Sequence, residues 1–324
     1  MPSKTELPRI RLVSSATNAV DGSVHWSPVK SVWLAAHYLV AIVGGALTFS
    51  LDAVAIFVVT TAVTLCLGHS LGMHRKLIHN SYACPKWLEH VFVHLGTIVG
   101  MAGPVGMVKT HDLRDWAQRQ PDCHPYLRHG TKPWKDAWWQ LHCDLKLTHP
   151  PRFQPEPRIA NDPVLAFMER TWMLQQLPLA SLLFGLGGLP WVVWGVCARV
   201  AVSVTGHWFI GHFAHNSGGM DNEVFGASVQ GHNVKWASYV TMGESWHNNH
   251  HAYPGSAILG LYENQPDPGW WVLNALANLG LAWGIVLPAE LPSRSNVRPL
   301  TNRAKVGVGS KGPHACPVLG LLRR

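Results

Sequence analysis

A run of residues near the C-terminal end of the chain holds histidines at a spacing that suits metal binding. It reads Gly-Glu-Ser-Trp-His-Asn-Asn-His-His-Ala-Tyr-Pro over residues 243–254, and its histidines are His247, His250 and His251. On a helix, residues at i, i+3 and i+4 share one face, so three imidazoles can converge on one ion. A lone histidine is usually a core or surface residue, whereas this spacing predicts a metal site.

Histidines elsewhere in the chain extend this prediction. The chain has 20 histidines and six cysteines. Four further histidines follow apolar segments and are predicted to join the site, namely His74, His79, His111 and His215. The cysteines show no CxxC spacing, which argues against a zinc knuckle or a disulfide framework. Imidazole clusters without thiolates suit borderline metals such as iron or zinc.

The composition places this site in a membrane protein. Of the 324 residues, 47% are hydrophobic, only 14% are charged and 16 are tryptophan. Such a chain is too apolar for an ordinary soluble enzyme. The mean hydropathy of +0.06 nevertheless requires a substantial water-facing portion. We therefore expect a few membrane-spanning helices and a polar cap within one domain.

Apolar segments of nearly membrane-spanning length occur in two pairs. They run from about 31 to 49, 53 to 71, 173 to 189 and 191 to 210, and each approaches the ~20 residues that a bilayer requires. Each pair is predicted to form a helical hairpin. The predicted fold is therefore all-α, with four transmembrane helices. The alternative is that these segments are buried helices of a large soluble core.

Basic residues flank the first predicted hairpin and are missing from its turn. They are Lys4, Arg9, Arg11 and Lys30 before it, and Arg75, Lys76 and Lys86 after it. By the positive-inside rule, both outer ends of the hairpin are cytoplasmic. The sequence predicts a multi-pass membrane domain over 31–288, with the metal site and both termini in the cytoplasm. Residues 1–30 and 289–324 are predicted to be flexible tails.

Two further apolar stretches are predicted to lie along the membrane surface. Residues 87–108 are interrupted by Glu89, His90 and His94, which makes them a poor membrane span. If they crossed the bilayer, the histidines after them would lie on the side opposite to the others. We therefore expect an amphipathic or re-entrant helix here, and an interfacial helix over 270–283. This topology gathers the histidines at one cytoplasmic level.

These motifs together resemble the integral-membrane fatty acid desaturases, most closely the stearoyl-CoA type of acyl-CoA desaturase. His74-Arg-Lys-Leu-Ile-His79 is similar to the first histidine box, HRxxxH, and is preceded by Gly68 and Gly72 at the matching spacing. The run over 243–254 is similar to the third box with its flanking residues. In the fourth predicted span, the residues at the family's spacing are Arg199, Trp208, Ala214 and His215. The resemblance covers roughly residues 68–283.

The resemblance implies an oxygen-dependent di-iron desaturase that introduces a cis double bond into a fatty acyl chain, carried by coenzyme A or by a lipid. It implies two iron ions, with dioxygen as co-substrate. The sequence shows no haem, flavin or iron–sulfur motif, so electrons are expected from a separate cytochrome, ferredoxin or rubredoxin and its reductase. The net charge of +8 suits membrane lipid, a coenzyme A phosphate or an acidic donor. Nucleic-acid binding is not expected.

The second histidine box departs from the family pattern. The family has HxxHH, whereas this chain has His111-Asp-Leu-Arg-Asp-Trp over 111–116. Arg114 and Asp115 therefore stand where two histidines are expected. A protonated arginine cannot bind a metal, but the Asp115 carboxylate lies one helical turn from His111 and is a good iron ligand. We predict that Asp115 replaces one imidazole. The alternative is an Arg/Asp cap or ion pair.

A second departure lies in the fourth predicted span, where Gly211 replaces the family's asparagine. His207, two turns before His215, is predicted to compensate as a ligand, and His212 is the alternative. His124 and His129 form another HxxxxH spacing in the loop after the altered box and are further candidates. The predicted ligands are thus His74, His79, His111, Asp115, His207, His215, His247, His250 and His251.

Other residues complete this interpretation. Glu244, Asp112 and Asn248 are candidate hydrogen-bond partners for the ligand histidines, because such histidines usually donate their second N–H to an oxygen. The remaining histidines are interpreted as ordinary packing or surface residues, namely His25, His37, His69, His142, His149, His232 and His314. Two other functions remain open: a hydroxylase on the same di-iron scaffold, and a non-catalytic membrane metal-binding or transport protein.

Overall fold

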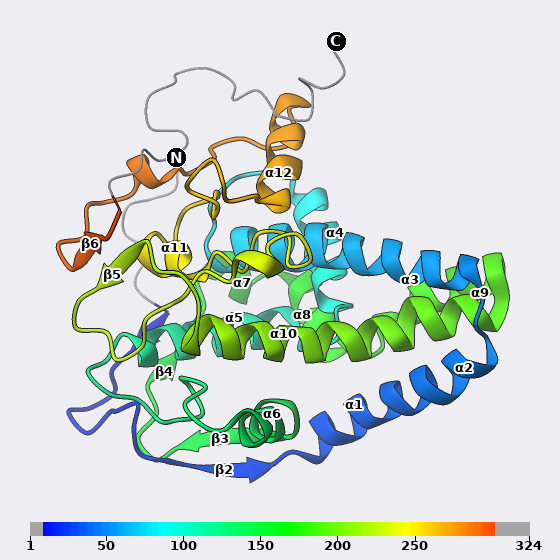
Figure 1. Cartoon of the computed structure of the whole chain (residues 1–324), viewed down its shortest axis with the longest axis horizontal. Coiled ribbons are helices and arrows are strands. Elements are labelled where there is room, and N and C mark those ends of the chain that lie inside the picture. Colours follow the sequence, from blue (N-terminus) through cyan, green and yellow to red (C-terminus); the bar gives the residue numbers. More distant parts are fainter. Residues whose placement is uncertain (1–8, 302–324) are drawn as a thin grey trace.

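Three long apolar helices extend from one side of the molecule, and the remaining elements form a cap at their other end (Figure 1). The computed structural model describes residues 9–301. The three helices span Pro28–Leu47, Leu51–Ile78 and Gln176–Asn216 and are long and apolar enough to cross a membrane. They comprise α1 (Pro28–Leu39), η1 (Val40–Gly44) and α2 (Gly45–Leu47); α3 (Leu51–Val63) and η2 (Thr64–Ile78); and α9 (Gln176–Val192), η3 (Val193–Ala198) and α10 (Arg199–Asn216).

The first two helices form the predicted hairpin. The chain turns between Leu47 and Leu51, where the side chain of Ser50 caps α3 by accepting a hydrogen bond from the amide of Ala53. A serine at this position satisfies an amide that has no partner within the helix. The second helix continues to Ile78, seven residues beyond the predicted span. Its last part, η2, is π-helical and carries the first histidine box into the cap.

The third long helix contains a reversal at Gly188. This glycine has φ 67° and ψ −158°, a backbone conformation that is essentially restricted to glycine. A contact between the residues on either side of Gly188 shows that the chain turns back there. Gly195 lies so close to Leu183 that a Cβ on Gly195 would be 2.5 Å from Cδ1 of Leu183. Residues so far apart would not touch along a straight helix. The last two predicted segments thus pack together within 176–216. The described residues contain three helices of membrane-spanning length, where the sequence predicted four spans.

The predicted surface helix over 87–108 is two helices. They are α4 (Lys86–Thr97) and α5 (Pro104–Gln118), separated by residues that include Gly100 at φ +94°. Glu169 caps α5 by accepting hydrogen bonds from the amides of Val105 (2.8 Å) and Gly106 (3.1 Å). The break turns α5 toward the other histidines, and α5 continues far enough to carry His111. The second predicted surface helix is α12 (Pro268–Asn278).

Short elements complete the cap. The helices are α6 (Pro133–His142), α7 (Pro157–Ala160), α8 (Pro163–Arg170) and α11 (His247–Ala252), with 3₁₀ turns η4 (Lys235–Ala237) and η5 (Pro288–Glu290). Three antiparallel strand pairs join distant segments. They are β1 (Ile10–Arg11) with β4 (Arg152–Phe153), β2 (Gly22–Trp26) with β3 (Cys143–Leu147), and β5 (Asn222–Val224) with β6 (Val297–Pro299).

The strands β1, β2 and β6 lie in segments that were predicted to be flexible tails. Their backbone groups pair with β4, β3 and β5, and Arg9 beside β1 forms an ion pair with Asp112 of α5 at 2.8 Å. Strand pairing between distant segments does not require a hydrophobic pattern in a short polar segment. The strands in these segments were therefore not predicted from the sequence. Residues 1–8 and 302–324, with His314 and Cys316, lie outside the described residues.

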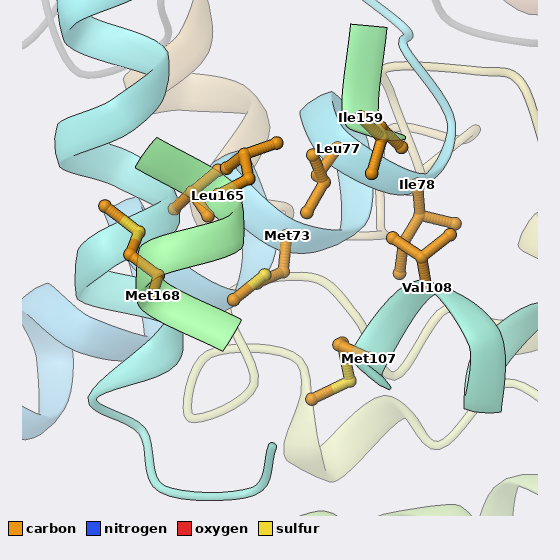
Figure 2. Packing of buried hydrophobic residues seen from close by; sticks show 9 residues of the cluster. Met73, Leu77, Ile78, Met107, Val108, Ile159, Leu165 and Met168 are labelled. Atoms are coloured by element: carbon orange, nitrogen blue, oxygen red, sulfur yellow. The ribbon is translucent and has the colours of Figure 1, made fainter. Parts of the chain in front are cut away.

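A hydrophobic cluster fixes η2 against the cap beside the first histidine box (Figure 2). Met73, Leu77 and Ile78 of η2 contact Met107 and Val108 of α5 and side chains from α7 and α8. Met73 and Leu77 are fully buried. Deleting one such side chain typically costs ~2–5 kcal/mol, because the surroundings cannot collapse into the cavity. This packing sets the position of His74 relative to His111.

Candidate metal centre

Four histidines from three separate segments converge in the cap, and we call them the first histidine group. They are His74 of η2, His79 at its C-terminal end, His111 of α5 and His250 of α11. One ring nitrogen of each lies within 4.8 Å of the others. The ring centroids are 4.6 to 5.9 Å apart. Residues 74 and 250 are far apart in sequence, so the fold itself brings these nitrogens together.

A buried carboxylate orients the first group. Nδ1 of His74 lies 2.6 Å from Oε2 of Glu244, while Oε1 of Glu244 accepts a hydrogen bond from Ser70 at 2.6 Å. Burial raises the pKa of Glu244, but the neighbouring His74 and Arg75 charges outweigh it and lower the pKa to about 2. Glu244 is therefore ionised. A carboxylate on Nδ1 leaves Nε2 of His74 as the nitrogen that faces the group.

An ion pair anchors the helix that carries His74. The guanidinium of Arg75 donates two hydrogen bonds to Asp267, at 2.8 and 3.0 Å, and Arg75 is 1% exposed. Asp267 also accepts hydrogen bonds from the amides of Leu259 and Gly260. A bidentate pair of this kind is directional. It therefore fixes η2 to the loop that follows α11.

Three more histidines form a second histidine group next to the first. His215 lies on α10, and His247 and His251 lie on α11; one ring nitrogen of each is within 4.8 Å of the others. The Nε2 atoms of His247 and His251 are 3.0 Å apart. Gln118 of α5 lies 3.3 Å from Nε2 of His215 through its amide nitrogen. The two groups share α11, which contributes His250 to one and its neighbours to the other.

Burial favours the neutral form of five of these imidazoles, those of His79, His215, His247, His250 and His251, and metal-binding histidines are neutral. Desolvation lowers the pKa of His79, His247 and His250 well below the usual value, and the charges of neighbouring histidines lower it further. Desolvation, followed by the charges of Arg119 and His111, lowers the pKa of His251 to about 3. Nε2 of His79 and Nδ1 of His250 are also buried without a hydrogen-bond partner. Unpartnered, neutral and convergent nitrogens fit metal ions.

The structure places seven of the nine predicted ligands in these two groups and the other two outside them. Asp115 forms an ion pair with Arg119 on the same helix, with an O–N distance of 2.7 Å. His207 packs against His69, with ring centroids 5.1 Å apart. His69, interpreted from the sequence as an ordinary histidine, is thus a buried neighbour of a candidate ligand. The ligand roles of Asp115 and His207 stay predictions.

A third cluster lies beside the second group and is centred on Asp136 of α6. Oδ2 of this fully buried carboxylate accepts hydrogen bonds from Nδ1 of His129 (2.8 Å), Nδ1 of His212 (2.9 Å) and Nε1 of Trp208 (2.9 Å). Burial raises the pKa of Asp136, but these bonds outweigh burial and lower it to about 2. We call this cluster the Asp136 network. Asp136 was not a candidate in the sequence, because no motif surrounds it.

The three candidate partner residues have different surroundings. Glu244 contacts His74 through Nδ1, as predicted for a partner of that histidine, and the ligand role of His74 stays a prediction. Asp112 lies 3.3 Å from Nδ1 of His111 and is also paired with Arg9. The side chain of Asn248 forms hydrogen bonds with backbone groups and not with a histidine. It accepts hydrogen bonds from the amides of Asp221 and Asn222 and donates hydrogen bonds to two backbone carbonyls. Asn248 therefore holds the loop around α11.

Comparison with known proteins identifies relatives over most of the chain. A model of the family described as fatty acid desaturase matches residues 51–266. The sn-2 palmitoyl-lipid 9-desaturase of Nostoc sp. is 34% identical over 226 residues, which cover 68% of this chain and 76% of that protein. The sn-1 stearoyl-lipid 9-desaturase of Synechocystis sp. is 34% identical over 247 residues, covering 75% and 74%. Acyl-CoA 5-desaturase AL21 of Anemone leveillei is 29% identical over 253 residues, covering 76% of each.

Proposed function

The chain belongs to the fatty acid desaturase family, and from this membership we propose an oxygen-dependent di-iron enzyme that introduces a cis double bond into the acyl chain of a membrane lipid. Membership makes the protein an oxidoreductase that acts on fatty acyl chains. The observation that carries the metal proposal is the convergence of seven buried or half-buried histidines in two adjacent groups at the end of the apolar helices.

The first histidine group would hold one iron and the second group the other. Bound iron supplies the activation of dioxygen that is needed to remove hydrogen from an unactivated methylene. Glu244 fixes His74 through Nδ1, and the pair of Arg75 with Asp267 holds η2 in place. Imidazoles suit this chemistry because thiolates are oxidised irreversibly. Asp115 pairs with Arg119 and His207 packs against His69, so either residue would have to give up that contact in order to bind an iron.

The reaction balances with an external reductant. The acyl chain loses two hydrogens, a donor protein supplies two electrons, the solvent supplies two protons, and both oxygen atoms leave as two water molecules. We propose a cytochrome, ferredoxin or rubredoxin with its reductase as the donor. The basic character of the chain supports an acidic donor surface, because complementary charges speed association.

The proposed substrate is an acyl chain esterified to a glycerolipid. Two relatives at 34% identity are named as lipid desaturases, whereas a relative named as an acyl-CoA desaturase is 29% identical. The resemblance to the stearoyl-CoA branch alone favoured coenzyme A as the carrier. A discriminating assay offers the membrane-reconstituted protein the same labelled stearoyl group on phosphatidylglycerol or on coenzyme A. Product from the coenzyme A ester alone would reverse this assignment.

We further propose that the chain crosses the membrane four times, with both histidine groups and both termini in the cytoplasm. The reversal at Gly188 supports two crossings within 176–216. His79 follows the end of the second long helix and His215 lies at the end of the third, so both groups lie at one level. Cysteine labelling of an introduced Leu189→Cys, an exposed position beside the reversal, from the outside of intact cells tests this topology. Labelling only after membrane permeabilisation would contradict it.

The central experiment measures iron and product in one preparation. Detergent-purified protein should contain about two irons per chain by elemental analysis. After one turnover with dioxygen and a chemical reductant, extracted lipid should contain unsaturated product. A hydroxylated product would assign the alternative hydroxylase function. Protein without iron would contradict the di-iron proposal.

A further inference from the structure

The second histidine group offers three imidazoles, whereas the first offers four. Arg114 and Gly211, two of the three positions where the sequence departs from the family pattern, lie next to it in space. Both contact the same side chain, that of His129. His129 lies in the loop between α5 and α6 and belongs to none of the three histidine boxes.

The ring of His129 lies beside one member of the second group, His215. It stacks on His215 with ring centroids 5.4 Å apart and an interplanar angle of 15°. The residue is 5% exposed, and its φ of +53° is in the left-handed region. A non-glycine residue in that region costs free energy, and such strain concentrates at functional sites. The backbone of the loop is thus strained at the residue whose imidazole packs against His215.

The Asp136 network fixes which nitrogen of His129 is available. Nδ1 of His129 donates a hydrogen bond to Oδ2 of Asp136 at 2.8 Å, because an ionised carboxylate can only accept hydrogen bonds. Nε2 therefore carries the ring's lone pair and is the nitrogen that can accept a hydrogen bond or bind a metal. A histidine whose Nδ1–H is held by a carboxylate is the usual form of a metal-binding histidine. Gln140 donates to the other oxygen of Asp136 at 3.3 Å and steadies it.

Nε2 of His129 points to Gly211 and Arg114. A Cβ at residue 211 would lie 3.3 Å from Nε2, so the absence of a side chain there makes room for the ring. Arg114 donates a hydrogen bond to Nε2 at 2.6 Å. It also donates to Oε1 of Gln140 at 2.8 Å and to the carbonyl of Leu127 at 3.3 Å. Arg114 can thus release Nε2 and keep two acceptors.

We infer that His129 is the fourth imidazole of the second iron site, with Asp136 as its positioning carboxylate. The side chain takes over the role that the second box has lost at Arg114, and Gly211 provides the space for it. This inference rests on the proposed di-iron function. It assigns the ligand to a loop residue, where the sequence had favoured Asp115 and His207.

The test is the number of irons held by the full-length, detergent-purified protein. The wild type should hold about two irons per chain, and His129→Ala and His215→Ala about one each. The double variant should also hold about one, because both residues serve the same ion. His142→Ala is the matched control: His142 stacks on Trp138 of the same helix as Asp136 and should leave two irons. Mössbauer spectra should show that both single variants lose the same iron component.

A second variant keeps every hydrogen bond and therefore guards against misfolding. Gly211→Ala places a methyl group 3.3 Å from Nε2 and should weaken only the second iron, by about tenfold in chelator competition. Two irons with unchanged spectra in His129→Ala, or unchanged chelator resistance in Gly211→Ala, would overturn the inference and leave the proposed function intact. A wild-type protein without iron would instead overturn the proposed function, and with it this inference.

Discussion

The first and second histidine groups share α11 but are built in different ways. The first takes its imidazoles from two helices that carry sequence motifs, η2 and α5, and its carboxylate partner, Glu244, lies three residues before His247. The second takes His215 from α10, and the loop residue His129, whose Nδ1 is bonded to Asp136, stacks on His215. Tertiary packing brings both groups together, but the first lies among sequence motifs, whereas the second lies beside altered positions and a loop that carries no motif. We expect the second group to be the more easily altered.

Removal of a histidine from the first group should abolish activity. His250→Ala deletes an imidazole whose ring centroid lies 4.6 Å from that of His74 and 4.8 Å from that of His79. The loss should exceed the ~10–100-fold that a supporting partner usually contributes. Product formation by lipid analysis measures the activity, and the iron count should fall to about one. His142→Ala should retain both. An active His250→Ala protein would show that the first group is not the reaction site.

Neutralising the carboxylate of the first group should weaken iron binding without changing the shape of the site. In Glu244→Gln the ionised partner of His74 becomes an amide, which we expect to lower iron affinity by ~10–100-fold. Chelator competition gives the affinity. The exposed Glu263→Gln is the control. Equal affinity in both variants would mean that Glu244 only fills space.

The corresponding change in the second group tests whether that group depends on the Asp136 network. Asp136→Asn keeps the size of the side chain but removes the charge that holds His129, His212 and Trp208. We expect about a tenfold loss of affinity at the second iron alone. The Mössbauer component that is lost in His215→Ala should weaken, and the other component should persist. Equal weakening of both components would show that the two groups are not independent.

Replacement of Asp115 should have the smallest consequence. Asp115→Ala breaks a partly exposed ion pair with Arg119, and such i,i+4 pairs contribute only ~0.3–0.5 kcal/mol. Iron content and activity should match those of Asp122→Ala, which breaks a similar exposed pair with Arg128. Thermal unfolding gives the stability change. Loss of an iron in Asp115→Ala alone would restore Asp115 as a ligand.

Patterns that are short in sequence were read correctly. The helical spacing over 247–251, the first box ending at His79 and the apolar segments each depend on one element, and the structure places them on helices. The break of 87–108 into α4 and α5 and the strands formed by the tails were missed, because both depend on contacts with distant residues. The sequence also favoured Asp115 because it faces the same side of α5 as His111.

The sequence by itself determined the chemistry of this protein: convergent imidazoles on apolar helices, with the motifs of the fatty acid desaturases. Helical periodicity and hydrophobicity are local properties, and they can be read without a structure. Only the tertiary structure decided what surrounds the altered second box. The residues that meet there come from three helices and a loop: Arg114 from α5, Asp136 from α6, Gly211 from α10 and His129 from the loop between α5 and α6. No spacing rule in the sequence links them. Their contacts exist because the chain folds back on itself, which a linear pattern does not record.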